Sequence, residues 1–318
     1  GVDMEAIVRE WQADKGCPTV VVKDGKVRQV TGQEQEWEQV SFKAYNPSGK
    51  DALLTVNIIL EERKISKVLL LPAGEAREYR YLTEPGAEYL EVNTNVSGNL
   101  PASISLDLYS SERMTTQDTS TGAFPIAPEA LLPPAGTIIV DNEDEGFTIN
   151  EGKQRHRLKD LFRKEEKEHY REFMAWQAPT EWSYSLMEFC YGDAILSGVF
   201  KAKGDGSASV TWEADIPEEG YYEFSVWNPS EIGKSMMFSD EKGQYHHPNR
   251  DQHYFVRYGE EEEEVVAQEM AEEPSGWMDL GHFLLPAGKV TVTLTDETNG
   301  LYVQADAIKF TRINMKDE

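Results

Sequence analysis

The sequence predicts an all-β protein with two β-sandwich domains and one helical insertion in the second domain. Short runs rich in Val, Ile, Leu and aromatic residues recur along the chain, and turn residues separate them. Apolar and polar residues alternate within the runs, as in 289–294, which is typical of a strand with one buried face. A stretch rich in Ser, Thr, Pro and Ala lies near the middle, and 318 residues are many for one sandwich. We therefore expect a domain at 1–111, a Pro-rich linker at 112–134 and a domain at 135–318.

The first domain is predicted to be an immunoglobulin-like sandwich, because its short strands are punctuated by Pro and Gly turns. The expected strands are 37–45, 53–60, 65–71, 76–82, 89–96 and 104–109. Before them, Asp24-Gly25 separates the apolar runs 19–22 and 26–30, and this dipeptide is the strongest short signal for a hairpin turn.

In the second domain, residues 137–147 resemble the opening strand and acidic turn of the C-terminal module named after golvesin and xanthan lyase. Residues 208–212 and 216–227 resemble its central hairpin. Residues 157–174 are predicted to form the one long helix, because apolar residues recur there at spacings of three and four. These residues are Leu158, Leu161, Phe162, Tyr170 and Phe173. Such a stripe favours packing across a sheet over docking a partner.

The end of the chain carries a recognisable order of segments. Trp277–Gly281, Pro286–Gly288, an alternating strand and then Ala305–Ile308 resemble the C-terminal module named after golvesin and xanthan lyase, over about 135–313. The resemblance implies a golvesin-like, jelly-roll-like sandwich with a carbohydrate-binding role. It also implies a binding or interaction module, not a catalyst.

A second resemblance concerns the start of the chain. Residues 4–30 leading into the first sandwich resemble the tail of large bacterial proteins that join permease and peptidase-like regions. This resemblance implies that the chain is a piece of a larger bacterial protein with an extracytoplasmic address, periplasmic or at the cell surface.

The net charge of −26 limits the partners. Residues 1–111 hold 12 basic and 17 acidic side chains, whereas 112–318 hold 19 and 40. Such a field repels nucleic acids and anionic membrane surfaces, so no nucleic acid partner is expected. An anionic polysaccharide is disfavoured unless a basic patch or a bridging cation intervenes. No apolar run approaches the length that spans a bilayer.

The sequence lacks the motifs that mark common catalysts. It contains no His-Glu-x-x-His, no phosphate-binding Gly-x-x-x-x-Gly-Lys and no nucleophile elbow. We therefore expect no enzyme activity, no cofactor and no metal site. Adjacent histidines such as His246 and His247 diverge, which disfavours their sharing one ion. Cys17 and Cys190 are expected to be free thiols in the two cores.

Two segments that depart from strand alternation, 175–192 and 244–254, hold the candidate ligand-binding residues. Sugar rings present C–H faces that stack on aromatic planes, and imidazoles supply donors and acceptors for hydroxyls. The candidates are Trp176, Trp182, Tyr184, Tyr191, Tyr245, His246, His247 and His253. For Trp182 and Tyr184 the alternative is that they cover the predicted helix.

Other aromatic residues stand in predicted strands or at positions of the golvesin-type framework. Trp212, Tyr222, Trp227 and Trp277 are therefore expected in or near the core. Asp306, between two alanines, is expected to be a buried acceptor for backbone amides.

These observations lead to one main functional hypothesis and one alternative. The main hypothesis is a non-catalytic module that binds a polysaccharide or glycan. The alternative is a structural accessory that docks or spaces other domains of the parent protein and has no glycan ligand.

Overall fold

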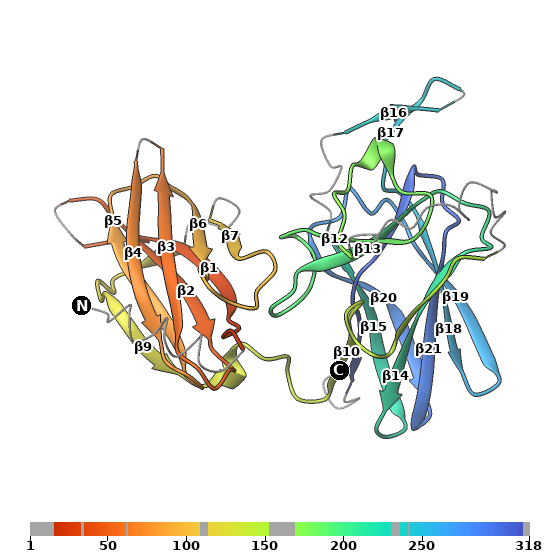
Figure 1. The fold of residues 1–318 in the computed structure, drawn as a ribbon, viewed down its shortest axis with the longest axis horizontal. Coiled ribbons are helices and arrows are strands. Elements are labelled where there is room, and N and C mark those ends of the chain that lie inside the picture. Colours follow the sequence, from red (N-terminus) through yellow and green to blue (C-terminus); the bar gives the residue numbers. More distant parts are fainter. Residues whose placement is uncertain are drawn as a thin grey trace. The chain divides into compact units, whose positions relative to one another are not determined.

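A computed structural model gives the fold, and it describes residues 16–32, 35–61, 63–108, 114–152, 169–229, 236–240 and 242–313. The helical elements in these ranges are two short 3-10 turns, η1 (Pro128–Ala130) and η3 (Ala175–Gln177). None of them is long and apolar enough to cross a bilayer. The chain divides into two compact units, 1–134 with 193–195 and 135–192 with 196–318 (Figure 1). The predicted all-β class is confirmed.

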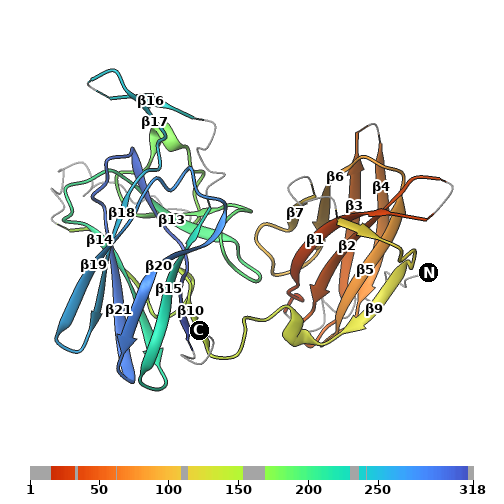
Figure 2. The ribbon, with the colours of Figure 1, turned by 180° about the vertical axis from the view of Figure 1, so that it is seen from behind.

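The first unit is a sandwich of two sheets (Figure 2). One sheet has, in order, β8 (Met114–Thr116), β1 (Val21–Val30), β2 (Trp37–Tyr45), β5 (Ala76–Thr83) and β9 (Gly122–Ile126). The other has β4 (Lys64–Leu71), β3 (Ala52–Leu60), β6 (Ala87–Asn93) and β7 (Ser103–Asp107). Phe42 and Tyr79 of the first sheet share a core with Leu54 and Leu90 of the second. The six strands predicted for this part are all present.

Asp24-Gly25 does not form the predicted hairpin turn. Both residues lie inside β1, which pairs with β2 on either side of them, and the register shifts at this dipeptide. Asp24 has a φ of 59°, in the left-handed region that Asp tolerates. A Cβ on Gly25 would lie 2.7 Å from Leu106 Cβ. The dipeptide therefore makes a bulge that strengthens the bend of β1 and does not reverse the chain.

The predicted Pro-rich linker is partly folded, since β8 and β9 form the two edges of the first sheet. Gln39 Nε2 donates to the Asp118 carbonyl at 3.1 Å. Arg80 donates to the Asp118 carboxylate at 2.7 Å and lies 4.7 Å over the Phe124 ring. Pro125 is tolerated in β9 because an edge strand can lack a ladder donor. The stretch through β9 therefore belongs to the first sandwich.

The second unit is built on two larger sheets and two smaller ones. The first large sheet has β10 (Thr137–Val140), β23 (Ile308–Arg312), β15 (Gly220–Asn228) and β20 (Gly276–Leu285). The second has β11 (Phe147–Asn150), β14 (Ser209–Ile216), β21 (Gly288–Thr295), β18 (Gln252–Tyr258) and β19 (Glu261–Ala267). The smaller sheets contain β12 (Ser183–Leu186), β13 (Ser197–Ala202) and β22 (Tyr302–Ala305), and β16 (Phe238–Ser239) with β17 (Tyr245–His246).

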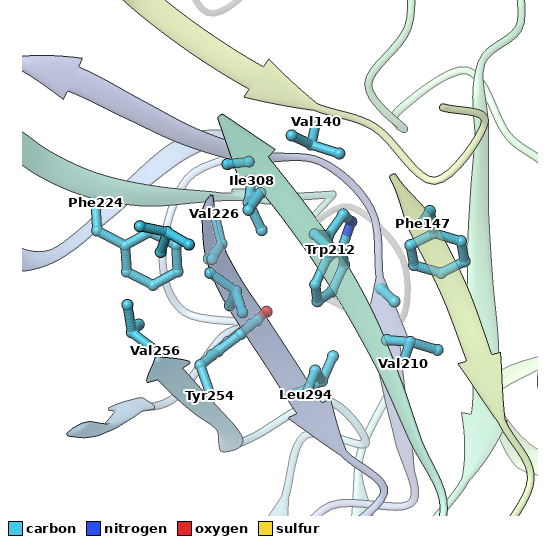
Figure 3. Close-up of a cluster of buried hydrophobic side chains, with 14 of the residues drawn as sticks. Val140, Phe147, Val210, Trp212, Phe224, Val226, Tyr254, Val256, Leu294 and Ile308 are labelled. Carbon is cyan, nitrogen blue, oxygen red and sulfur yellow. The ribbon is translucent and has the colours of Figure 1, made fainter. Parts of the chain in front are cut away.

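The main core of the second unit lies between its two large sheets (Figure 3). Phe224 from the first sheet and Val256 from the second are both fully buried. Trp212 and Tyr254 lie between them and Phe147, with ring centroids of Trp212 and Phe147 5.4 Å apart. The predicted burial of Trp212 is confirmed, as is that of Tyr222.

The predicted hairpin at 208–227 is wrong, because β14 and β15 lie in opposite sheets. The turn at 217–219 carries the chain from one sheet to the other. β20 and β21 cross in the same way through Pro286 and Ala287. As a result β14 pairs with β21, and β15 pairs with β20.

The predicted helix at 157–174 is also wrong where the structure can be compared with it. Residues 153–168 lie outside the described residues, and 169–174 are not helical. Tyr170 forms a β-bridge with Tyr184. Phe173 stacks on Phe200, with ring centroids 4.2 Å apart. These two members of the apolar stripe are thus partly buried from an extended backbone.

The small three-stranded sheet carries its own apolar cluster, which includes Cys190, Phe200 and Tyr302. Burial raises the pKa of the Cys190 thiol. Cys17, in contrast, is exposed, so the expectation that both thiols lie in cores is correct only for Cys190.

Candidate functional site

The eight predicted ligand-binding residues do not gather in one place. Trp176 in η3 and Tyr245 in β17 are highly exposed, at 63% and 70%. Their segments are linked, because Ala175 and Met236 belong to the same apolar cluster. This part of the unit therefore offers two accessible rings.

Trp182 and Tyr184 face the interior instead. Trp182 is 6% exposed and belongs to the main core. Tyr184 is half-buried, stacks on His169 at 4.5 Å and donates from its hydroxyl to the Asn142 carbonyl at 3.3 Å. The burial of Trp182 contradicts its predicted stacking on sugar, whereas the same prediction for Tyr184 stays a prediction.

The predicted histidines make local contacts. His246 Nε2 lies 3.1 Å from Asp240 Oδ2, and His247 Nδ1 lies 3.1 Å from the Met236 carbonyl. These contacts tie the β16–β17 hairpin together.

His253 lies in β18, not in a loop, between two carboxylates. Its Nδ1 is 2.8 Å from Glu264 Oε1 and its Nε2 is 3.2 Å from Asp251 Oδ2. Partial burial lowers the pKa of His253, but the two carboxylates outweigh it and the net pKa is raised. Burial raises the pKa of Asp251, but hydrogen bonds from Asn299 N–H and His253 outweigh it and the net pKa is lowered. Both shifts favour a charged pair within the protein.

The strongest candidate site is a group of three rings that we call the aromatic cluster: Tyr191, Trp227 and Trp277. Their centroids form a triangle, with Tyr191 5.4 Å from Trp227 and 5.1 Å from Trp277, and the two indoles 5.3 Å apart. All three are half-buried, so part of each ring meets solvent. Of the eight predicted residues, only Tyr191 belongs to it.

Strand alternation places the cluster on the solvent side of the first large sheet. In β15, Tyr222, Phe224 and Val226 point into the core. Trp227 points the other way and lies directly opposite Trp277 of β20. The two tryptophans, expected in or near the core, are thus half-buried on the outer face of the sheet and form part of a surface.

Hydrogen bonds fix the positions of Tyr191 and Trp227 in the aromatic cluster. The Tyr191 backbone N–H lies 3.2 Å from both carboxylate oxygens of Asp306, and Trp227 Nε1 donates to the Phe189 carbonyl at 2.8 Å. Asp306 is 4% exposed, as expected for a buried acceptor of backbone amides. Burial raises the pKa of Asp306 well above its usual value, and the contacts with Tyr191 and Cys190 oppose that shift.

Polar side chains continue this face beside the rings. Lys309 Nζ lies 4.8 Å over the Trp277 ring and 3.8 Å from Glu223 Oε1. Ser225 Oγ lies 3.2 Å from the same carboxylate, and Asp279 is directly opposite Ser225 in the sheet. The face therefore combines aromatic rings with donors and acceptors, which is the chemistry that a carbohydrate requires.

Residues 170–312 match the family model of the Golvesin C-terminal domain. Over these residues the second unit is similar to that domain, and the predicted golvesin-type resemblance is confirmed. All three residues of the aromatic cluster lie within the matched range. A search of curated proteins gave no match.

Several solved structures are distantly similar. A Paenibacillus xanthan lyase has 15% identity and a TM-score of 0.36, covering 93% of this chain and 25% of that one. A Podospora anserina GH26-CBM35 β-(1,4)-mannanase has 15% identity and a TM-score of 0.25, covering 57% and 28%. An Arthrobacter globiformis isomalto-dextranase complexed with panose has 12% identity and a TM-score of 0.28, covering 86% and 34%. The chain spans about a quarter to a third of these proteins, and likenesses this weak carry no argument about function.

Proposed function

We propose that the second unit is a non-catalytic carbohydrate-binding module whose ligand stacks on the aromatic cluster. The observation that carries the proposal is the triangle of three half-buried rings on the solvent side of a sheet. The golvesin-type match, with the carbohydrate-related role that the resemblance implies, supports the same function.

The chemistry of the face sets the expected strength of binding. Stacking a sugar ring on one aromatic ring contributes about 1–2 kcal/mol, by analogy with other aromatic contacts. Lys309 and Asp279 lie beside the rings and can meet hydroxyls, whereas Ser225 is buried and contacts Glu223. A few such contacts give affinities of roughly millimolar to micromolar Kd.

The test uses the full chain in affinity electrophoresis through gels that contain neutral glucans, mannans or galactans. Trp227→Ala combined with Trp277→Ala is expected to abolish retardation in any gel that retards the parent chain. The matched control is Trp176→Ala combined with Tyr245→Ala, which removes the two exposed rings of the other predicted region. Melting curves of both double variants show whether the second unit remains folded.

The outcomes separate the candidates. If only the Trp176 and Tyr245 double variant loses retardation, the ligand binds at the predicted loops and the cluster is not the site. If no gel retards the unmutated chain and no glycan array binds it, the alternative is supported: a structural accessory that docks other domains of a larger protein.

We also propose that this larger protein is extracytoplasmic, in line with the golvesin-type resemblance.

We further propose that the two units are independent domains. Each has its own core of buried apolar side chains. Residues 135–318 expressed alone are therefore expected to unfold in one cooperative thermal transition. A fragment without such a transition, when the full chain shows one for this unit, would contradict the proposal.

A further inference from the structure

Three side chains on the outer face of the first large sheet bring metal-binding atoms together. Glu223, Asp279 and His282 each offer one donor atom, and these atoms all lie within 4.8 Å of one another. Donors bound to one ion at about 2.0–2.2 Å lie up to roughly 4.4 Å apart, so small side-chain rotations suffice to coordinate an ion.

A bulge in the pairing of β15 and β20 creates this arrangement. Residues three apart in a regular strand point to opposite faces, so Asp279 and His282 would normally diverge. Phe224 pairs with Gly281 and Ser225 with Asp279, so the register shifts between them and leaves Leu280 as the extra residue; Gly281 has a φ of 138°. Asp279 and His282 therefore both join Glu223, which lies directly opposite His282. Bulges of this kind often re-aim side chains at functional sites.

One oxygen of each carboxylate accepts a hydrogen bond that orients the group. Asp279 Oδ1 accepts from Gly281 N–H at 2.9 Å, while Oδ2 lies 4.0 Å from His282 Nε2, too far for a hydrogen bond. Glu223 Oε1 accepts from Ser225 Oγ at 3.2 Å. Such hydrogen bonds orient ligands in protein metal sites.

The surroundings favour a divalent cation. The carboxylates of Glu223 and Asp279 outnumber the nearby cation Lys309 among the described residues. Lys309 Nζ lies 3.8 Å from Glu223 Oε1 and 4.8 Å over the Trp277 ring. The Asp279 and His282 side chains are 51% and 55% exposed, so an ion can enter from solvent and keep open positions for water. This half of the chain is also strongly acidic.

We propose that Glu223, Asp279 and His282 bind a divalent transition-metal ion of the Zn²⁺ class. An imidazole with two carboxylates suits such ions, whereas Ca²⁺ takes six to eight oxygen ligands. The ion would lie beside the aromatic cluster. The proposal does not depend on carbohydrate binding, because it concerns the ion alone.

The test is calorimetric titration of the full chain with Zn²⁺ at pH 7, with no sugar present. We expect one site per chain, together with quenching of tryptophan fluorescence by Ni²⁺ because Trp277 is close. Glu223→Gln, Asp279→Asn and His282→Gln should each weaken Zn²⁺ binding at least about tenfold. Ca²⁺ should not compete.

Two control variants separate this site from adventitious binding. His246→Gln removes another histidine that contacts a carboxylate, and Glu219→Gln removes an exposed charge from the turn that precedes β15. Both should leave Zn²⁺ affinity unchanged. The inference would be overturned if the unmutated chain had no Zn²⁺ site, or if the three ligand variants and both controls lost Zn²⁺ affinity equally. Either result leaves the carbohydrate proposal standing.

Discussion

Trp212→Ala is expected to lower the free energy of unfolding of the second unit by about 3–5 kcal/mol. The Trp212 side chain is 1% exposed, and its ring lies 5.4 Å from Phe147 and 6.4 Å from Tyr254. Its Nε1 donates to the Asp306 carbonyl at 2.9 Å. The substitution therefore leaves a cavity and a buried carbonyl without its donor.

Urea denaturation of the full chain, followed by circular dichroism, measures this loss. Trp176→Ala is the matched control, since that indole is 63% exposed, and it should leave the midpoint almost unchanged. If Trp212→Ala and the control behave alike, the core assigned between the two large sheets is wrong.

Asp296→Ala has an expected effect of the same size, about 3–5 kcal/mol, because it leaves a buried charge unpaired. Lys201 Nζ donates to Asp296 Oδ2 at 2.7 Å, and the two side chains are 10% and 3% exposed. Asp296 Oδ1 accepts from Gly206 N–H at 2.8 Å. A Cβ on Gly204 would lie 1.8 Å from Asp296 Oδ2, so the turn fits closely around this carboxylate.

The same denaturation experiment tests the buried pair. Lys201→Met combined with Asp296→Ala should recover part of the loss, because no unpaired ammonium group remains. Glu213→Ala, which breaks the exposed contact with Lys289, serves as the control and should have little effect. Equal stability of Asp296→Ala and the parent chain would rule out the role given to this pair.

The sandwich architecture could be predicted because strand alternation reports burial directly. The 37–45 segment matches β2 residue for residue, and Val290, Val292 and Leu294 of β21 are all buried. The connections could not be predicted in this way. A short turn such as 217–219 joins paired strands or crosses between sheets, and the local residues do not distinguish these outcomes. Asp24-Gly25 likewise permits a left-handed backbone in a bulge as well as in a hairpin turn.

The candidate site was harder to predict than the fold. The sequence predicts Trp227 and Trp277 in or near the core, because they stand in a predicted strand or at a position of the golvesin-type framework. The sequence did hold a contrary signal. In strand alternation Trp227 falls on the same face as Glu223 and Ser225, and the apolar residues Tyr222, Phe224 and Val226 fall on the other face. Tyr191 joins them only through the tertiary fold, from a segment far from both strands. Its place next to Trp277 could not be read from sequence.

The central claim is that carbohydrate binds to the outer face of the first large sheet. Tryptophan oxidation of the full chain, read residue by residue by mass spectrometry, tests it most directly. The polysaccharide that retards the chain most strongly is present in one sample and absent in the other. We expect the polysaccharide to protect Trp227 and Trp277, while Trp176 oxidises at the same rate in both samples. Unchanged oxidation of Trp227 and Trp277 in the presence of a retained polysaccharide would contradict it.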